Sequence, residues 1–195
     1  GHRRLSIIDL SAAGNQPMSG CQGRYQIVYN GEFYNYKEVK NKLLAIENPY
    51  PFQFGSDTEV ILAAYHAWGV NCLQHINGMF AFAICDNQKN EIVLARDVVG
   101  IKPLYYQFKN NTLLFASEIR ALIHSGLIDK KINLKSVAEY IQYTTVHAPN
   151  TIMQDVLMLM PGHILELQNG NLKIQQYWNI NDFAKQKTNN YNNIW

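Results

Sequence analysis

Short strand-like segments recur along this sequence and restrict its fold more than any other feature does. Each is rich in β-branched, aromatic or other apolar side chains and is bounded by turn-forming residues. These segments are Leu5–Asp9, Tyr25–Tyr29, Met79–Ile84, Glu91–Arg96, Leu104–Gln107, Thr112–Ala116, Ile164–Gln168 and Leu172–Gln176. So many short strands exclude an all-helical fold.

The pattern within the strands predicts how the sheets are layered. Large residues alternate in Tyr25–Tyr29, whereas Met79–Ile84 is apolar on both faces, as in a strand that lies between two other layers. Asn169-Gly170 separates the last two strands and is typical of a tight hairpin. We expect mostly antiparallel pairing, and we assign Asn77-Gly78 to a type I′ turn as well.

Helix signals are interleaved with the strands. Asn35 with Glu38 and Ser56 with Glu59 have the spacing of capping boxes, and Gly69 supplies a stop for the second helix. Each of the two boxes is followed by an apolar stripe, so the sequence predicts two amphipathic helices. The mixture of elements predicts an α+β fold.

Two further helices are expected in the second half of the chain. One spans 117–124, and the other is capped by Asn133. The second carries an apolar stripe at helical spacing, formed by Leu134, Val137, Ala138 and Ile141. From residue 179 the composition turns to Asn and Lys, so we expect 179–195 to be a linker or a domain edge.

Composition excludes several classes of partner. Seventeen basic against fifteen acidic residues, without a basic cluster, offer nucleic acid no large footprint, and the longest apolar run, Gly78–Cys85, is too short for a bilayer. The three cysteines lack a CxxC and the six histidines lack metal-ligand spacing, so we expect no metal. The odd cysteine count is typical of a reducing, cytoplasmic location.

Polar residues at the ends of three predicted elements are the candidate site: Arg4, Asn30-Gly31-Glu32 and Asp57. Each has a structural alternative. Asn30-Gly31 followed by a carboxylate is also the pattern of a type I′ turn, Asp57 would stabilise a helix start through the helix dipole, and Arg4 would be a solvated charge.

The same residues would also suit a site that binds an amino acid with a carboxamide group. A carboxamide substrate needs two donors aimed at its developing oxyanion, and the Asn30 side chain with the Gly31 N–H would supply them. An amino-acid substrate also needs a guanidinium for its carboxylate and carboxylates for its ammonium group. Arg4, Glu32 and Asp57 would form that set.

Several motifs in order and at approximate spacing resemble the glutaminase domain of glutamine-hydrolysing asparagine synthetases, a class II glutamine amidotransferase family. They are His2–Ser11, Asn15–Met18, Asn30–Tyr36, Ser56–Leu62, Asn77–Ile84, Ala95–Asp97, Gly100–Tyr106, Phe115–Ile119, Pro161–His163 and Tyr177–Trp178. The resemblance covers residues 1–178, which we take as one domain. Amidotransferases that form phosphoribosylamine or hexosamine share part of the pattern.

The resemblance implies an N-terminal nucleophile hydrolase fold, a four-layer αββα sandwich of two antiparallel sheets, here truncated at the N-terminus. It implies that Asn30 and Gly31 form the oxyanion hole and that Glu32 and Asp57 hold the ammonium group of L-glutamine. The remaining pocket residues that it implies are Arg4, Leu5, Ser6, Ile7 and Ile8. We interpret Arg96-Asp97, another family motif, as a structural ion pair.

One departure from the family concerns the nucleophile, which is an N-terminal Cys whose own α-amine serves as base. This sequence opens Gly1-His2 without Met, so we expect a fragment that cannot hydrolyse glutamine alone. The family's synthetase domain, which uses ATP and Mg²⁺, is a further implied partner, and the resemblance leaves a homodimer open. Two alternatives remain: an amidotransferase with another acceptor, and a non-catalytic domain that binds glutamine or docks to a partner.

Overall fold

The computed structural model describes residues 2, 14–53 and 55–182, and the predicted strand Leu5–Asp9 lies outside them. The described strands form a six-stranded sheet, in the order β1-β2-β3-β4-β8-β9, and a three-stranded sheet, in the order β6-β5-β7. The strands are β1 (Met18–Gly20), β2 (Tyr25–Phe33), β3 (Gly78–Asp86), β4 (Glu91–Arg96), β5 (Tyr105–Lys109), β6 (Thr112–Ala116), β7 (Leu157–Met158), β8 (His163–Gln168) and β9 (Asn171–Gln176). The helices are α1 (Tyr36–Leu44), α2 (Asp57–Trp68), η2 (Gly69–Gln74), α3 (Ile119–His124) and α4 (Leu134–Tyr143).

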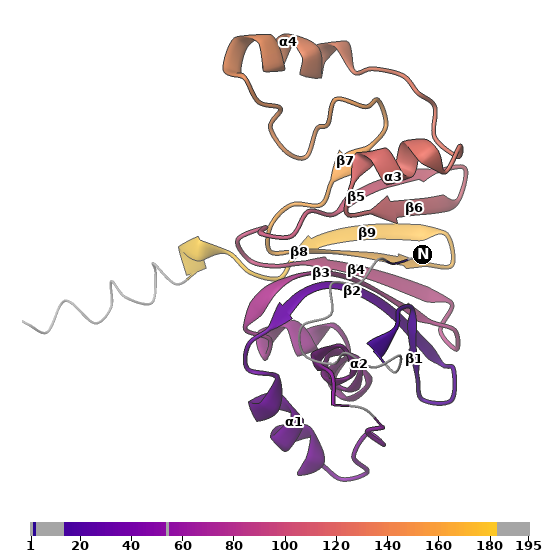
Figure 1. Ribbon diagram of the computed structural model, residues 1–195, viewed down its shortest axis with the longest axis vertical. Helices are drawn as coiled ribbons and strands as arrows, with labels where there is room; N and C mark the ends of the chain where they lie inside the picture. The colour runs from indigo at the N-terminus through magenta and orange to yellow at the C-terminus, as the bar shows by residue number, and fades with distance from the viewer. Residues whose placement is uncertain (1, 3–13, 54, 183–195) are drawn as a thin grey trace, which may run out of the picture.

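The elements stack in four layers (Figure 1). Helices α1 and α2 cover one face of the large sheet. An apolar core that includes Ile27 and Phe33 lies between these helices and the sheet. A second core, with Ala81 and Leu94, fills the space between the two sheets. A third packs α3 against the small sheet. Every strand pair is antiparallel, which confirms the predicted α+β sandwich.

Most predicted strands are present, and two short ones were not predicted. β4 and β6 have the predicted bounds, while β2 runs four residues past the predicted end at Tyr29 to Phe33. β1 and β7 have three and two residues, too few for an alternating pattern to be read from sequence. No helix among the described residues is long and apolar enough to cross a membrane.

The capping predictions are confirmed at two helices and wrong at one. The Ser56 hydroxyl accepts the Glu59 N–H at 3.2 Å, and Asn133 caps α4. Asn35 precedes α1, but its side chain makes no cap bond. It instead donates to the His75 carbonyl and accepts the Asn77 N–H at 2.8 Å, because that loop lies beside it.

The two Asn-Gly dipeptides behave differently. Asn169 and Gly170 have φ of 51° and 80°, so they form the predicted hairpin turn between β8 and β9. The turn predicted at Asn77-Gly78 is wrong, because Gly78 is the first residue of β3 and pairs with Phe33. A glycine is needed there for another reason: a Cβ at Gly78 would lie 2.2 Å from the Glu32 carbonyl oxygen.

An ion pair closes the far end of β2 and β3. Arg24 donates from Nε and Nη2 to the two carboxylate oxygens of Asp86 at 3.1 and 2.9 Å, and the Asp86 side chain is fully buried. Burial raises the pKa of Asp86, but the Arg24 guanidinium and the N–H groups of Lys89 and Gln88 outweigh it and hold that pKa below its ordinary value. The ion pair therefore stabilises the folded protein only while Asp86 is charged.

We expect Arg24→Met to lower the free energy of unfolding by about 2 kcal/mol at pH 7, because it leaves a buried carboxylate without its cation. The depressed pKa stabilises the folded protein above the ordinary Asp pKa of 3.8, and this stabilisation is lost as pH falls through the folded pKa. The difference between Arg24→Met and the wild type should therefore shrink in acid. Denaturation at pH 7 and in acid checks this, with Lys42→Met, which removes an exposed pair with Glu38, as the near-neutral control. A difference that grows in acid would contradict it.

Candidate functional site

Asn30, Gly31 and Glu32 lie within β2 and not in a turn after it. They pair in continuous antiparallel register with Ala81, Phe80 and Met79 of β3. The type I′ turn, which the sequence left open for Asn30-Gly31, is therefore wrong. The backbone of these three residues is paired with β3 along its whole length, so the sheet fixes their positions.

The backbone of β3 leaves no room for a side chain at Gly31. A Cβ at this position would lie 2.1 Å from the Met79 carbonyl oxygen and 2.8 Å from the Phe80 Cα. Both are backbone atoms, so no side-chain movement relieves the contact. A residue other than glycine would push the two strands apart at the candidate site.

The N–H of Gly31 points to the edge of β2 that faces away from β3. The N–H of Tyr29 donates to Gln16 Oε1 at 2.5 Å, and the N–H of Phe33 donates to Asp57 Oδ2 at 3.3 Å. Neither acceptor belongs to β3, and alternate N–H groups of a strand point to the same edge. The Gly31 N–H therefore lies between the amide oxygen of Gln16 and the carboxylate of Asp57.

Asp57 is the first residue of α2 and lies against the end of β2. Its Oδ2 accepts the Tyr29 hydroxyl at 3.3 Å as well as the Phe33 N–H, and its Oδ1 accepts the Thr58 N–H at 2.9 Å. Burial raises the pKa of Asp57, and these hydrogen bonds oppose the rise. The structural role that the sequence allowed for Asp57 is thus present, and it fixes the carboxylate at the edge that the Gly31 N–H faces.

The side chains of Asn30 and Glu32 lie on the other face of the sheet from Tyr29 and Phe33. Tyr29 and Phe33 belong to the core beneath α1 and α2, and Val28 packs on the core between the sheets. Because successive side chains alternate, Asn30 and Glu32 share the inter-sheet face with Val28. The structure thus brings four predicted residues to one end of β2, with Asn30 and Glu32 on a face and Asp57 at the edge. The others, Arg4, Leu5, Ser6, Ile7 and Ile8, lie outside the described residues.

Asp97 braces the strand opposite this site. Its buried carboxylate accepts five backbone N–H groups, one from Phe80 of β3, at 3.2 Å, and four from the turn that follows, at Val99, Gly100, Ile101 and Lys102. Phe80 pairs with Gly31. Asp97 therefore joins the turn to the strand that lies next to the candidate site.

Arg96 binds backbone carbonyl groups, as Asp97 binds backbone N–H groups. It donates to the carbonyl oxygens of Lys102, Leu159 and Gly100 at 2.7 to 2.8 Å. Arg96 and Asp97 are therefore structural, as expected, but the predicted ion pair is wrong, because each side chain binds backbone. Gln16 lies in the Asn15–Met18 motif but was not predicted as a site residue, because its contact with Tyr29 depends on a distant strand.

None of the three cysteines has the properties of an activated thiol. Cys72 is fully buried, and burial raises its pKa to about 12. Burial also raises the pKa of Cys21, against the opposing charge of Arg24, and that of Cys85. The described residues contain no cluster of His, Cys, Asp and Glu that could hold a metal ion.

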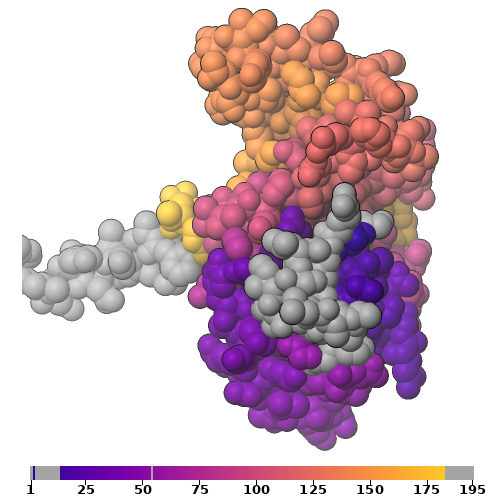
Figure 2. Space-filling model, in the orientation of Figure 1, coloured from indigo at the N-terminus to yellow at the C-terminus, as the bar shows by residue number. Residues whose placement is uncertain are grey.

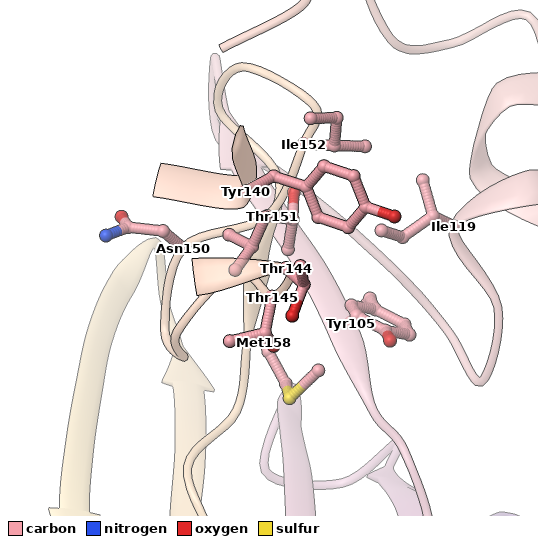
Figure 3. Close-up of a pocket in the computed structure, with 10 residues that line it drawn as sticks. Tyr105, Ile119, Tyr140, Thr144, Thr145, Asn150, Thr151, Ile152 and Met158 are labelled. Atoms are coloured by element: carbon pink, nitrogen blue, oxygen red, sulfur yellow. The ribbon is translucent and has the colours of Figure 1, made fainter. Parts of the chain in front are cut away.

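A separate cleft of about 410 Å³ lies far along the chain from these residues (Figure 3). It is enclosed by the small sheet, α3, α4 and the loop after α4, and its walls include Tyr105, Ile119, Tyr140 and Ile152. None of the predicted site residues that the structure describes, Asn30, Gly31, Glu32 and Asp57, lines it. The cleft and the end of β2 are therefore distinct features.

Two antiparallel sheets lie between helical layers, so the fold is an α+β sandwich. A family profile described as the glutamine amidotransferase domain matches residues 1–178. The chain belongs to this family.

Proteins similar to this chain carry different names. "Asparagine synthetase [glutamine-hydrolyzing] 3" of Bacillus subtilis is 35% identical over 184 residues, covering 92% of this chain and 29% of that protein. "Amidase chry2" of Gibberella zeae is 36% identical over 189 residues, covering 95% and 27%. The solved glutamine phosphoribosylpyrophosphate amidotransferase of B. subtilis has a TM-score of 0.62 at 20% identity, covering 91% of this chain and 34% of that chain. The chain thus spans under a third of the length of these two curated relatives.

Proposed function

We propose that this chain is the glutamine-hydrolysing domain of an asparagine synthetase and that it releases ammonia for ATP-dependent amidation of aspartate by a second domain. The observation that carries the proposal is the Gly31 N–H at the edge of β2 that faces away from β3, between Gln16 and Asp57 and adjacent in sequence to Asn30. The name of the B. subtilis relative supports the choice of acceptor.

The proposed chemistry assigns a role to each group. A thiolate attacks the glutamine carboxamide, the oxygen of the tetrahedral intermediate accepts from the Asn30 amide and the Gly31 N–H, and ammonia leaves. Water then releases glutamate from the thioester. Asp57 and Glu32 hold the substrate's ammonium group, and Arg4 with residues 5–8 holds the rest of the amino acid.

We place the nucleophile in the full-length protein and not at Cys21, Cys72 or Cys85. Their raised pKa values keep them as thiols near neutral pH, and none carries the free α-amine that the family uses as base. We therefore propose that these 195 residues alone do not hydrolyse glutamine. ATP and Mg²⁺ belong, on this proposal, to the second domain.

A different acceptor is the second candidate, because the amidase-named relative is as similar as the synthetase. The glutamine site would be the same in both cases. Product analysis of the full-length protein with glutamine, ATP and aspartate distinguishes them. Asparagine supports the first proposal, and glutamine hydrolysis without asparagine supports the second.

We expect Asp57→Asn in the full-length protein to lower kcat/KM for glutamine by about tenfold to a hundredfold, because a hydrogen bond to a charged group is lost. Use of free ammonia should not change, since that substrate needs no ammonium site. Parallel assays with the two nitrogen donors check this, and Glu38→Gln, an exposed first-turn carboxylate of α1, is the control. Equal losses with both donors would contradict the role given to Asp57.

A further inference from the structure

Helix α4 presents its apolar side to solvent. Ser136 is its only fully buried residue, while Leu134 and Ile141 are 79% and 77% exposed. The helix projects at one end of the molecule, beyond α3 (Figures 1 and 2). This is the reverse of an ordinary surface helix, whose apolar stripe faces the core.

Helical geometry shows that the reversal extends along the stripe, in which Val137 is half-buried and the other three residues are exposed. With about 100° between successive residues, Leu134, Val137, Ala138 and Ile141 fall on one side of α4, and Ser136 falls nearly opposite. Because Ser136 faces the protein, this group, which we term the outward stripe, faces away from it. The sequence predicted an amphipathic helix correctly, but the described residues of the domain do not cover its apolar side.

The 410 Å³ cleft lies on another side of α4 from the outward stripe. Tyr140, which lines that cleft, falls about 40° from Ser136 around the helix axis, and no residue of the stripe is among the cleft's lining residues. The proposal therefore rests on the stripe alone, because contiguous exposed apolar surface marks an interaction site.

We propose that the outward stripe of α4 is the docking surface for the second domain of the same polypeptide. The two curated relatives described above carry about 70% of their length outside the matched part, which is room for at least one further domain. The identity of the occupant rests on the proposed function, whereas the docking surface rests on the exposure of α4.

A domain of the same chain fits this surface better than a second copy does. A stable dimer needs about 800 Å² of contact per partner, which is more than one face of a ten-residue helix provides. A tethered domain has a high effective concentration, so a smaller contact suffices. The stripe also carries no charged residue that would fix the orientation of a separate partner.

Thiol labelling in the full-length protein tests the proposal. Ile141→Cys and Leu134→Cys place a reporter in the stripe, and Leu44→Cys places one on α1, where Leu44 is 52% exposed. We expect maleimide to label both stripe positions at least about tenfold more slowly than Leu44→Cys, at rates that do not depend on protein concentration. Peptide mapping separates these sites from the native cysteines, and glutamine hydrolysis measured on each variant shows whether the domain is folded.

Each outcome supports or contradicts the docking surface or its proposed occupant. Labelling of the stripe as fast as Leu44→Cys would overturn the docking surface, and protection that disappears on dilution would assign it to a second copy instead. Slow labelling in a protein that makes no asparagine would retain the surface and reject the proposed acceptor, so the two proposals fail separately.

Discussion

Asp97→Asn is expected to lower the free energy of unfolding by about 3 to 5 kcal/mol, the largest stability effect of any single substitution considered for this chain. The buried carboxylate accepts five backbone N–H groups. An Asn side chain of the same shape turns one acceptor oxygen into an NH₂ donor, which then faces the N–H groups that the carboxylate accepted. Of these, the Gly100 N–H also donates to the Asp97 carbonyl at 3.1 Å.

Chemical denaturation of Asp97→Asn checks this, with Asp155→Asn as the matched control. Asp155 is a half-exposed carboxylate in a surface pair with Lys109, so its loss should cost less than about 1 kcal/mol. Because Asp97 anchors the partner strand of Gly31, glutamine hydrolysis should fall along with stability. An Asp97→Asn protein as stable as the Asp155→Asn protein would show that the turn holds without the carboxylate.

Asn30→Ala is expected to have the largest effect on catalysis, a loss of about 10² to 10³ in kcat for glutamine hydrolysis, as for other oxyanion-hole donors. Asn30 is half-buried in β2, and its backbone ladder to β3 does not involve the side chain. Stability should therefore change little. Binding of glutamine should also change little, because the donor acts mainly on the charge that develops in the transition state.

Sequence patterns predicted the layers well because they depend on local periodicity. Met79–Ile84, apolar on both faces, is the part of β3 that lies between two cores, and Ser56 caps α2 as its spacing indicated. The errors occurred where a distant contact decides. Asn77-Gly78 has turn chemistry, yet Gly78 pairs with Phe33 at the start of β3. A glycine is needed there because the Glu32 carbonyl leaves no room for a Cβ.

At the candidate site, too, local patterns were predicted and distant contacts were not. The residue types at Asn30, Gly31 and Asp57 were apparent from sequence, whereas the shared edge of β2 was not, since it depends on where α2 begins relative to the strand. Arg96 and Asp97 are adjacent and oppositely charged, so an ion pair was the natural expectation. Their backbone partners lie on other segments, and no local pattern reveals them.

The most direct test of the oxyanion hole is ammonia release from glutamine by the full-length protein and by Asn30→Ala and Gln26→Ala, assayed side by side with free ammonia as the alternative nitrogen donor. Gln26 is an exposed amide on the same strand and is the matched control. We expect only Asn30→Ala to lose glutamine hydrolysis, by about 10² or more, while all three proteins use free ammonia equally. Full glutamine hydrolysis by Asn30→Ala would contradict an oxyanion hole at the end of β2.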